Sequence, residues 1–146
     1  MKTNSIFTIV SILGYFTLTN NLFAQTTVFD IIQGSPDHTL LEAALVQEGL
    51  DGALGDTSAD YTVFAPNDSV INAYLASEGI TAADLLATPN LSDILLHHVL
   101  GSTFLATDLV NGEVTTLNGL DVTIDVTASP LIDSATVLNA DVPAYN

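Results

Sequence analysis

The 146-residue sequence contains no cysteine, and Lys2 is the one lysine or arginine it has. The missing cysteine excludes disulfides, thiolate metal sites and cysteine nucleophiles, as well as the lipid-attachment cysteine of a bacterial lipoprotein signal. Charged residues make up only 12% of the chain, which is about half the share found in a typical soluble domain. Because 17 residues are Asp or Glu, the formal charge of −16 arises from the missing basic residues rather than from an excess of acids.

A chain with almost no basic residues is limited in the partners it can bind. A negative surface repels phosphate backbones and anionic lipid headgroups, so neither nucleic acid nor a bare membrane is an expected partner. Two interpretations of the charge stay open: an acidic surface that simply suits an exported protein, or an affinity for divalent cations or basic partners. The sequence has no Asp-x-[Asp/Asn]-x-[Asp/Asn]-Gly loop that would predict a dedicated calcium site.

Residues 1–24 have the pattern of a secretory signal peptide. Lys2 gives a basic start, residues 6–18 are mostly apolar, and Ala24 ends a plausible cleavage site. The apolar stretch is shorter than the roughly 18 residues that a membrane span needs. Removing this segment would leave one domain, residues 25–146, and the loss of Lys2 would change its formal charge from −16 to −17. We therefore expect a secreted, periplasmic or outer-surface location.

The central stretch of the chain is residues 61–71, YTVFAPNDSVI. Its first residues are aromatic and β-branched, which favours a strand. Pro66 ends that strand because it has no amide hydrogen to donate. Asn67 is then a suitable N-cap for a helix, since its side-chain oxygen can accept from the first free amides. The stretch thus predicts a strand that passes directly into a capped helix.

Three motifs in order resemble the signatures of the fasciclin domain family. They are TVFAPNDSVI at residues 62–71, LSDILLHHVLGSTF at residues 91–104, and VTTLNGLDVTI at residues 114–124. In the second motif His97 stands in the position of the family's tyrosine, and His98 matches its histidine. The resemblance covers the chain from about Thr27 to its last residue.

The resemblance implies an α+β fold in which α-helices pack on a wedge of β-sheets, formed by residues 25–146. Fasciclin domains continue with a last strand of the type Gly-Val-x-His-Val-Ile-Asp, and this sequence stops where that strand would begin. We therefore expect a C-terminally incomplete domain that lacks the last strand.

Capping and breaking residues predict the helices. Thr27 and Asp37 are expected to cap two helices before the central stretch, and Thr81 is expected to cap a short helix after it. The Leu-rich segment from Leu91 to about Leu100 is predicted as one helix that Gly101 closes.

The period of the sequence changes to that of strands in its last third. Residues 114–117 and 120–126 are predicted strands joined by Asn118-Gly119, a strong signal for a two-residue hairpin turn. Alternation along the second strand predicts one buried face, which includes Val122 and Ile124, and one wet face. Residues 136–142 are predicted as a further strand.

The two adjacent histidines are the first candidates for chemistry. On a helix their side chains would point about 100° apart, which makes shared metal coordination awkward, so no metal site is expected. His98 shares a helical face with Leu95 and Val99 and is predicted to be a core histidine held by a hydrogen bond. His97 follows Asp93 by four residues and is predicted to pair with it at the surface.

Enzymatic activity is not expected. The sequence has no Gly-x-Ser-x-Gly elbow, no grouped serine, histidine and aspartate, and no phosphate-binding loop. With 17 acidic residues, pairs of carboxylates arise by composition alone. No cofactor is predicted.

The resemblance to fasciclin domains implies an adhesion or interaction module that binds a cell-surface or matrix protein or a polysaccharide. Two alternatives stay open: a structural domain of the envelope or matrix without a dedicated ligand, and a calcium-dependent binder. In the family, the segments that match residues 62–71 and 91–100 are associated with adhesion. The residues of these segments expected to reach solvent, and so to interact, are Asn67, Asp68, Asp93 and His97. Those expected to form the core of the motifs are Val63, Phe64, Pro66, Leu95 and His98.

Overall fold

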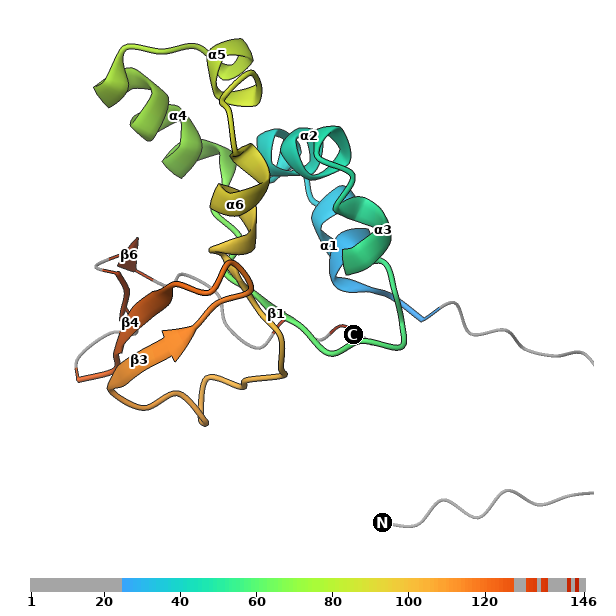
Figure 1. The fold of residues 1–146 in the computed structure, drawn as a ribbon, viewed down its shortest axis with the longest axis vertical. Helices are drawn as coiled ribbons and strands as arrows, with labels where there is room; N and C mark the ends of the chain where they lie inside the picture. The colour runs from blue at the N-terminus through green and yellow to red at the C-terminus, as the bar shows by residue number, and fades with distance from the viewer. Residues whose placement is uncertain (1–24, 128–130, 134, 137–141, 143, 145–146) are drawn as a thin grey trace, which may run out of the picture.

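The structure is a computed structural model that describes residues 25–127, 131–133, 135–136, 142 and 144. Helices occupy one side of the molecule and strands the other, with β1 running between the two (Figure 1). The predicted α+β class is confirmed. The signal peptide predicted for residues 1–24 lies outside the described residues, as does most of the strand predicted for residues 136–142.

Six α-helices lie within the described residues. They are α1 (Val28–Gln33), α2 (Thr39–Gln47), α3 (Asp51–Leu54), α4 (Asp68–Glu78), α5 (Ala82–Leu86) and α6 (Leu91–Leu96). The predicted caps Thr27 and Thr81 each accept a hydrogen bond from the amide of an aspartate three residues on, whose carboxylate bonds back to the cap. This reciprocal capping box satisfies amides that would otherwise lack partners at the start of α1 and α5.

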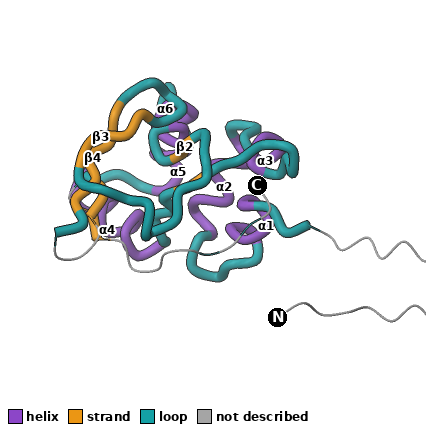
Figure 2. Tube along the Cα trace, turned by 90° about the horizontal axis from the view of Figure 1, so that it is seen from below, coloured by secondary structure: helices purple, strands orange, loops and turns teal. Residues whose placement is uncertain are grey.

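The strands form two antiparallel sheets. The small sheet pairs β1 (Thr62–Val63) with β2 (Val99–Leu100), and the larger sheet has the order β3-β4-β5-β6. Its strands are β3 (Gly112–Thr115), β4 (Asp121–Asp125), β5 (Leu131–Ile132) and β6 (Ala135–Thr136). Figure 2 shows the β3–β4 hairpin at the opposite end of the molecule from α1 and α3.

The prediction of one helix from Leu91 to about Leu100 is wrong at its C-terminal end. The helix α6 stops at Leu96, and Val99 and Leu100 form strand β2, which pairs with Val63 and Thr62. Both β2 residues are buried. Burial beside β1 and pairing with it outweigh the helical propensity of this Leu-rich segment, since propensity is a weak prior against tertiary contacts.

The hairpin is present, but its turn differs from the two-residue turn predicted. Val114 pairs with Val122 and Thr115 with Asp121, so five residues lie between the paired ends. The Thr116 amide donates to the Leu120 carbonyl at 2.9 Å. Gly119 has a φ of 83°, which fits a turn followed by a left-handed residue in a bulge. The left-handed conformation therefore falls on Gly119 alone.

Two apolar clusters hold the fold together. The first is built mainly by helices and includes Leu45 and Leu91, while the second lies under the larger sheet and consists of Val122, Ile124 and Ile132. The predicted inward face of β4 is thus confirmed for Val122 and Ile124. Neighbouring residues at β1 face opposite clusters: Val63 packs on the first and Phe64 on the second. The alternation of side chains in extended backbone explains why one short segment joins both clusters.

Candidate interaction surface

The turn from β1 into α4 is built as the sequence predicts. Pro66 follows the strand, and Asn67 is the N-cap of α4 with extended backbone. The Oδ1 atom of Asn67 accepts a hydrogen bond from the Val70 amide at 2.9 Å. The oxygen of this amide side chain is therefore already engaged within the fold.

Asp68 caps a second helix, α2, from outside it. Its carboxylate accepts hydrogen bonds from the Thr39 amide at 3.1 Å, the Thr39 hydroxyl at 2.6 Å and the Leu40 amide at 2.9 Å. The Asp68 amide in turn donates to the Asp37 carbonyl at 2.7 Å. The N-cap residue of α2 is His38, whose side chain makes no capping bond. The prediction that Asp37 caps this helix is wrong, because Asp68 satisfies its first amides.

These contacts change the acidity of Asp68. Partial burial raises the pKa of the carboxyl, but hydrogen bonds from Thr39 and Leu40, with the charge of nearby His38, outweigh it and hold the pKa below its ordinary value. Ionised Asp68 is thus favoured in the folded chain, as expected for a carboxylate at a helix N-terminus.

His97 lies where the end of α6 meets the larger sheet. Its Nδ1 atom is 3.3 Å from both Asn118 Oδ1 and Thr116 Oγ1, and its Nε2 atom is 3.7 Å from Asp133 Oδ2. The contact with Asp133 is an ion pair when the imidazole is protonated. The predicted pairing of His97 with Asp93 is wrong, because α6 ends at Leu96 and the side chain turns to the hairpin instead.

Asp93 is joined to the same hairpin through its backbone. The Asn118 Nδ2 atom donates to the Asp93 carbonyl at 3.1 Å, and this carbonyl also accepts from the His97 amide at 3.0 Å. The Asp93 side chain is exposed, and no ion pair or hydrogen bond of its carboxylate occurs within the described residues. Its carboxylate is therefore available to a partner.

His98 makes contacts different from those of His97. Its Nδ1 atom lies 2.8 Å from the Ile94 carbonyl oxygen, so the predicted hydrogen bond is present. The side chain is half-buried, however, and not a core residue, because His98 follows the end of α6 and precedes β2. Its carbonyl accepts from the Phe64 amide at 2.8 Å, which continues the pairing of the two strands.

The remaining residues expected in the core of the motifs differ in how deeply they are buried. Leu95 is buried with 7% of its surface exposed, whereas Val63, Phe64 and Pro66 are half-buried. These three residues lie in or just after a sheet of only two short strands, which leaves part of each side chain exposed.

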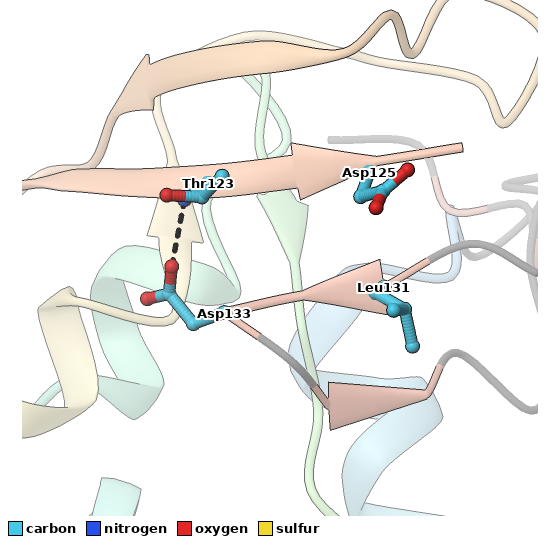
Figure 3. Close-up of a pocket in the computed structure, with 4 residues that line it drawn as sticks. All are labelled: Thr123, Asp125, Leu131 and Asp133. Carbon is cyan, nitrogen blue, oxygen red and sulfur yellow. Dashed lines mark hydrogen bonds between the residues drawn. The ribbon is translucent and has the colours of Figure 1, made fainter. Parts of the chain in front are cut away.

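A shallow hollow of about 350 Å³ lies on the outer face of the larger sheet, lined by Thr123, Asp125, Leu131 and Asp133 (Figure 3). The Thr123 amide donates to Asp133 Oδ1 at 2.7 Å, which fixes one carboxylate at its rim. Hydrogen bonds from the side chain and amide of Thr127 hold the pKa of Asp125 below its ordinary value. The hollow is therefore an ionised, hydrogen-bond-accepting surface.

We call the combined region the junction surface: the hollow together with Asp93, His97 and Asn118. Asp133 links its two parts, since it lines the hollow and contacts His97. Among the described residues, no group of three or more His, Asp or Glu side chains is placed to share a metal ion. Chemically, the junction surface can accept hydrogen bonds and attract positive charge.

Sequence reasoning found Asp93 and His97 but missed Asn118 and Asp133. The Asn118-Gly119 pair indicated a turn, and no local pattern tells that the Asn118 side chain spans to α6. Asp133 has a φ of 47° in the turn after β5, and its position depends on strand pairing.

The fold is that of an α+β domain, and comparison with known proteins gives its family. Residues 36–146 match the family of the Fasciclin domain. A relative from Synechocystis sp., Protein sll1483, is 32% identical over 124 residues, which span 82% of this chain and 67% of the relative. The chain belongs to the fasciclin domain family, and fasciclin domains are generally associated with cell adhesion.

None of the helices in the part of the chain that the structure describes combines the length and apolar character needed to cross a bilayer. Fasciclin domains are typically extracellular.

Proposed function

We propose that this chain is a secreted or cell-surface adhesion module that binds a protein or polysaccharide partner through the junction surface. The observation that carries the proposal is the Asp93 carboxylate, which is exposed and lacks a partner in the described fold, four residues before His97, whose side chain is 30% exposed. His97 adjoins the hollow through Asp133, and Asp93 is tied to the same hairpin through Asn118.

The construction of the junction surface suits recognition. Asn118 donates to the Asp93 carbonyl and its Oδ1 lies 3.3 Å from His97 Nδ1, which ties the end of α6 to the β3–β4 hairpin. The binding groups therefore come from elements that hold one another in place. A partner then meets groups that are already positioned, which reduces the entropy lost on binding. Carboxylates accept from the hydroxyl groups of sugars and from the N–H groups of proteins, and both classes of partner fit this chemistry.

Asn67 and Asp68 enter this proposal differently from Asp93 and His97. The side-chain oxygens of Asn67 and Asp68 cap α4 and α2. We propose that they support interaction by holding those helices, so that changing them lowers binding in proportion to lost stability.

Two other functions predict different behaviour. A structural domain without a dedicated ligand would show no saturable binding to cells or matrix. A calcium-dependent binder would lose binding when the ion is chelated. We favour the adhesion module because the chain belongs to a family associated with adhesion.

The experiment is a saturation binding assay of the fluorescently labelled chain on cells and on isolated envelope material, with and without a calcium chelator. We expect saturable binding that unlabelled chain competes and that chelation leaves unchanged. Binding that never saturates would contradict a dedicated partner, and binding abolished by chelation would establish the calcium-dependent alternative.

A further inference from the structure

One edge of the larger sheet has no neighbouring strand among the residues that the structure describes. Strand β3 stands at the end of the order β3-β4-β5-β6, so within this part of the chain only one of its sides is paired. Glu113 and Thr115 are exposed, and neither backbone has another partner among the described residues. We propose that this edge accepts an extended basic segment of a partner protein as an added strand.

The register shows which backbone groups are free. Thr116 and Leu120 form a hydrogen-bonded pair, since the Thr116 amide donates to the Leu120 carbonyl at 2.9 Å. In an antiparallel ladder such pairs alternate along the strand, so Val114 bonds to its partner Val122. The amide and carbonyl groups of Glu113 and Thr115 consequently point away from β4. They offer donors and acceptors at the spacing that a new strand requires.

The side chains around this edge select the sequence of the incoming strand. Glu113 and Thr115 are exposed on the outer face, and Thr115 donates to the carboxylate of its cross-strand neighbour Asp121 at 2.6 Å. Val114 is half-buried and packs against the cluster under the sheet. A strand laid beside β3 would place alternate residues next to carboxylates and next to Val114. Lysine or arginine alternating with apolar residues is the sequence that fits both faces.

The charge of the chain decides between possible occupants. The whole chain carries a formal charge of −16, so a second copy would bring like charge to a face that already holds Glu113 and Asp121. Like charges brought together at an interface weaken association. A basic segment is attracted by the same field, and we therefore commit to a cationic strand from another protein. Glu113 is the cross-strand neighbour of Thr123, which lines the hollow, but the changes that test this edge leave Asp93 and His97 unaltered, so either proposal can fail alone.

The test measures binding of the full chain to a synthetic peptide of about eight residues that alternates lysine and valine. Thr115→Pro removes the outward amide and leaves the bonds to β4 in place, because the Thr115 amide does not belong to that ladder. Thr115→Ala is its matched control. Glu113→Lys is compared with Glu78→Lys, which makes the same charge change at the exposed end of α4.

We expect Thr115→Pro to lower the affinity for the peptide by about fivefold relative to Thr115→Ala. Glu113→Lys should lower this affinity by about tenfold relative to Glu78→Lys. A peptide N-methylated at alternate backbone positions should bind the unaltered chain as weakly as the unmethylated peptide binds Thr115→Pro. This tests strand addition without altering the fold. Equal losses for both lysine variants, or unchanged binding of the methylated peptide, would overturn the proposal. So would self-association of the chain that Thr115→Pro abolishes, since the occupant would then be a second copy.

Discussion

Asp68 accepts hydrogen bonds from both the amide and the hydroxyl of Thr39, a residue 29 positions earlier in the chain. This contact joins the start of α4 to the start of α2. The cap of one helix is thereby supplied by another, and the strand-to-helix turn is fixed to the helical cluster. Asn67 and Asp68 therefore stabilise the fold itself, by capping α4 and α2.

Replacing Asp68 with alanine is expected to destabilise the chain by about 1 kcal/mol, the usual loss for a helix cap. The amides of Thr39 and Leu40 would lose their acceptor. Asp60→Ala is the control, because Asp60 is exposed and makes no hydrogen bond among the described residues. Urea unfolding of both variants checks this, and equal midpoints would show that the contact contributes nothing.

The effect of Asp68 should depend on pH in a defined direction. Its pKa is lowered in the folded chain, so its contribution is fully present above the unfolded value of about 3.9 and is lost as the pH falls through the folded-state pKa. The stability difference between the unaltered chain and Asp68→Ala should therefore shrink below about pH 4. Unfolding curves at a series of pH values measure it. A stability difference that grew as the pH fell would contradict a lowered pKa for Asp68 in the folded chain.

Added salt should stabilise the chain. The formal charge is −16 and Lys2 is the one lysine or arginine, so little offsets the repulsion between carboxylates. Sodium chloride screens that repulsion over about 10 Å at 0.1 M. The melting temperature is expected to rise with salt, as scanning calorimetry can show. A steady fall would mean that attractive charge contacts dominate.

Two glycines should respond to alanine in opposite directions. Gly119 has a φ of 83°, so Gly119→Ala is expected to destabilise the chain by about 1 kcal/mol. Gly52 lies inside α3, and an added Cβ there would meet nothing within 4 Å. Gly52→Ala should therefore stabilise by up to about 1 kcal/mol through helix propensity. Thermal unfolding distinguishes them, and a Gly119→Ala variant as stable as the unaltered chain would refute the hairpin turn described above.

Features set by neighbouring residues could be predicted from the sequence. The caps at Thr27, Asn67 and Thr81 each depend on contacts within a few positions. The alternation along β4 likewise identified Val122 and Ile124 as buried, because its period follows from strand geometry.

Features set by distant segments could not be predicted. Val99 and Leu100 leave the helical pattern because they pair with β1, and nothing near them in sequence signals that partner. His97 turns to Asn118 and Asp133 for the same reason, since the hairpin and the turn after β5 come from later in the chain. The sequence therefore predicted half of the candidate site: Asp93 and His97 were identified, and Asn118 and Asp133 were not.

The most direct test of the account compares the binding isotherm of the Asp93→Asn/His97→Gln chain with that of Asp60→Asn/His38→Gln. Both make the same chemical changes, but only the first alters the junction surface. We predict that the first loses saturable binding to cells or envelope material by about tenfold or more, with an unchanged melting temperature, while the control binds normally. Equal binding by both variants would contradict the proposed site.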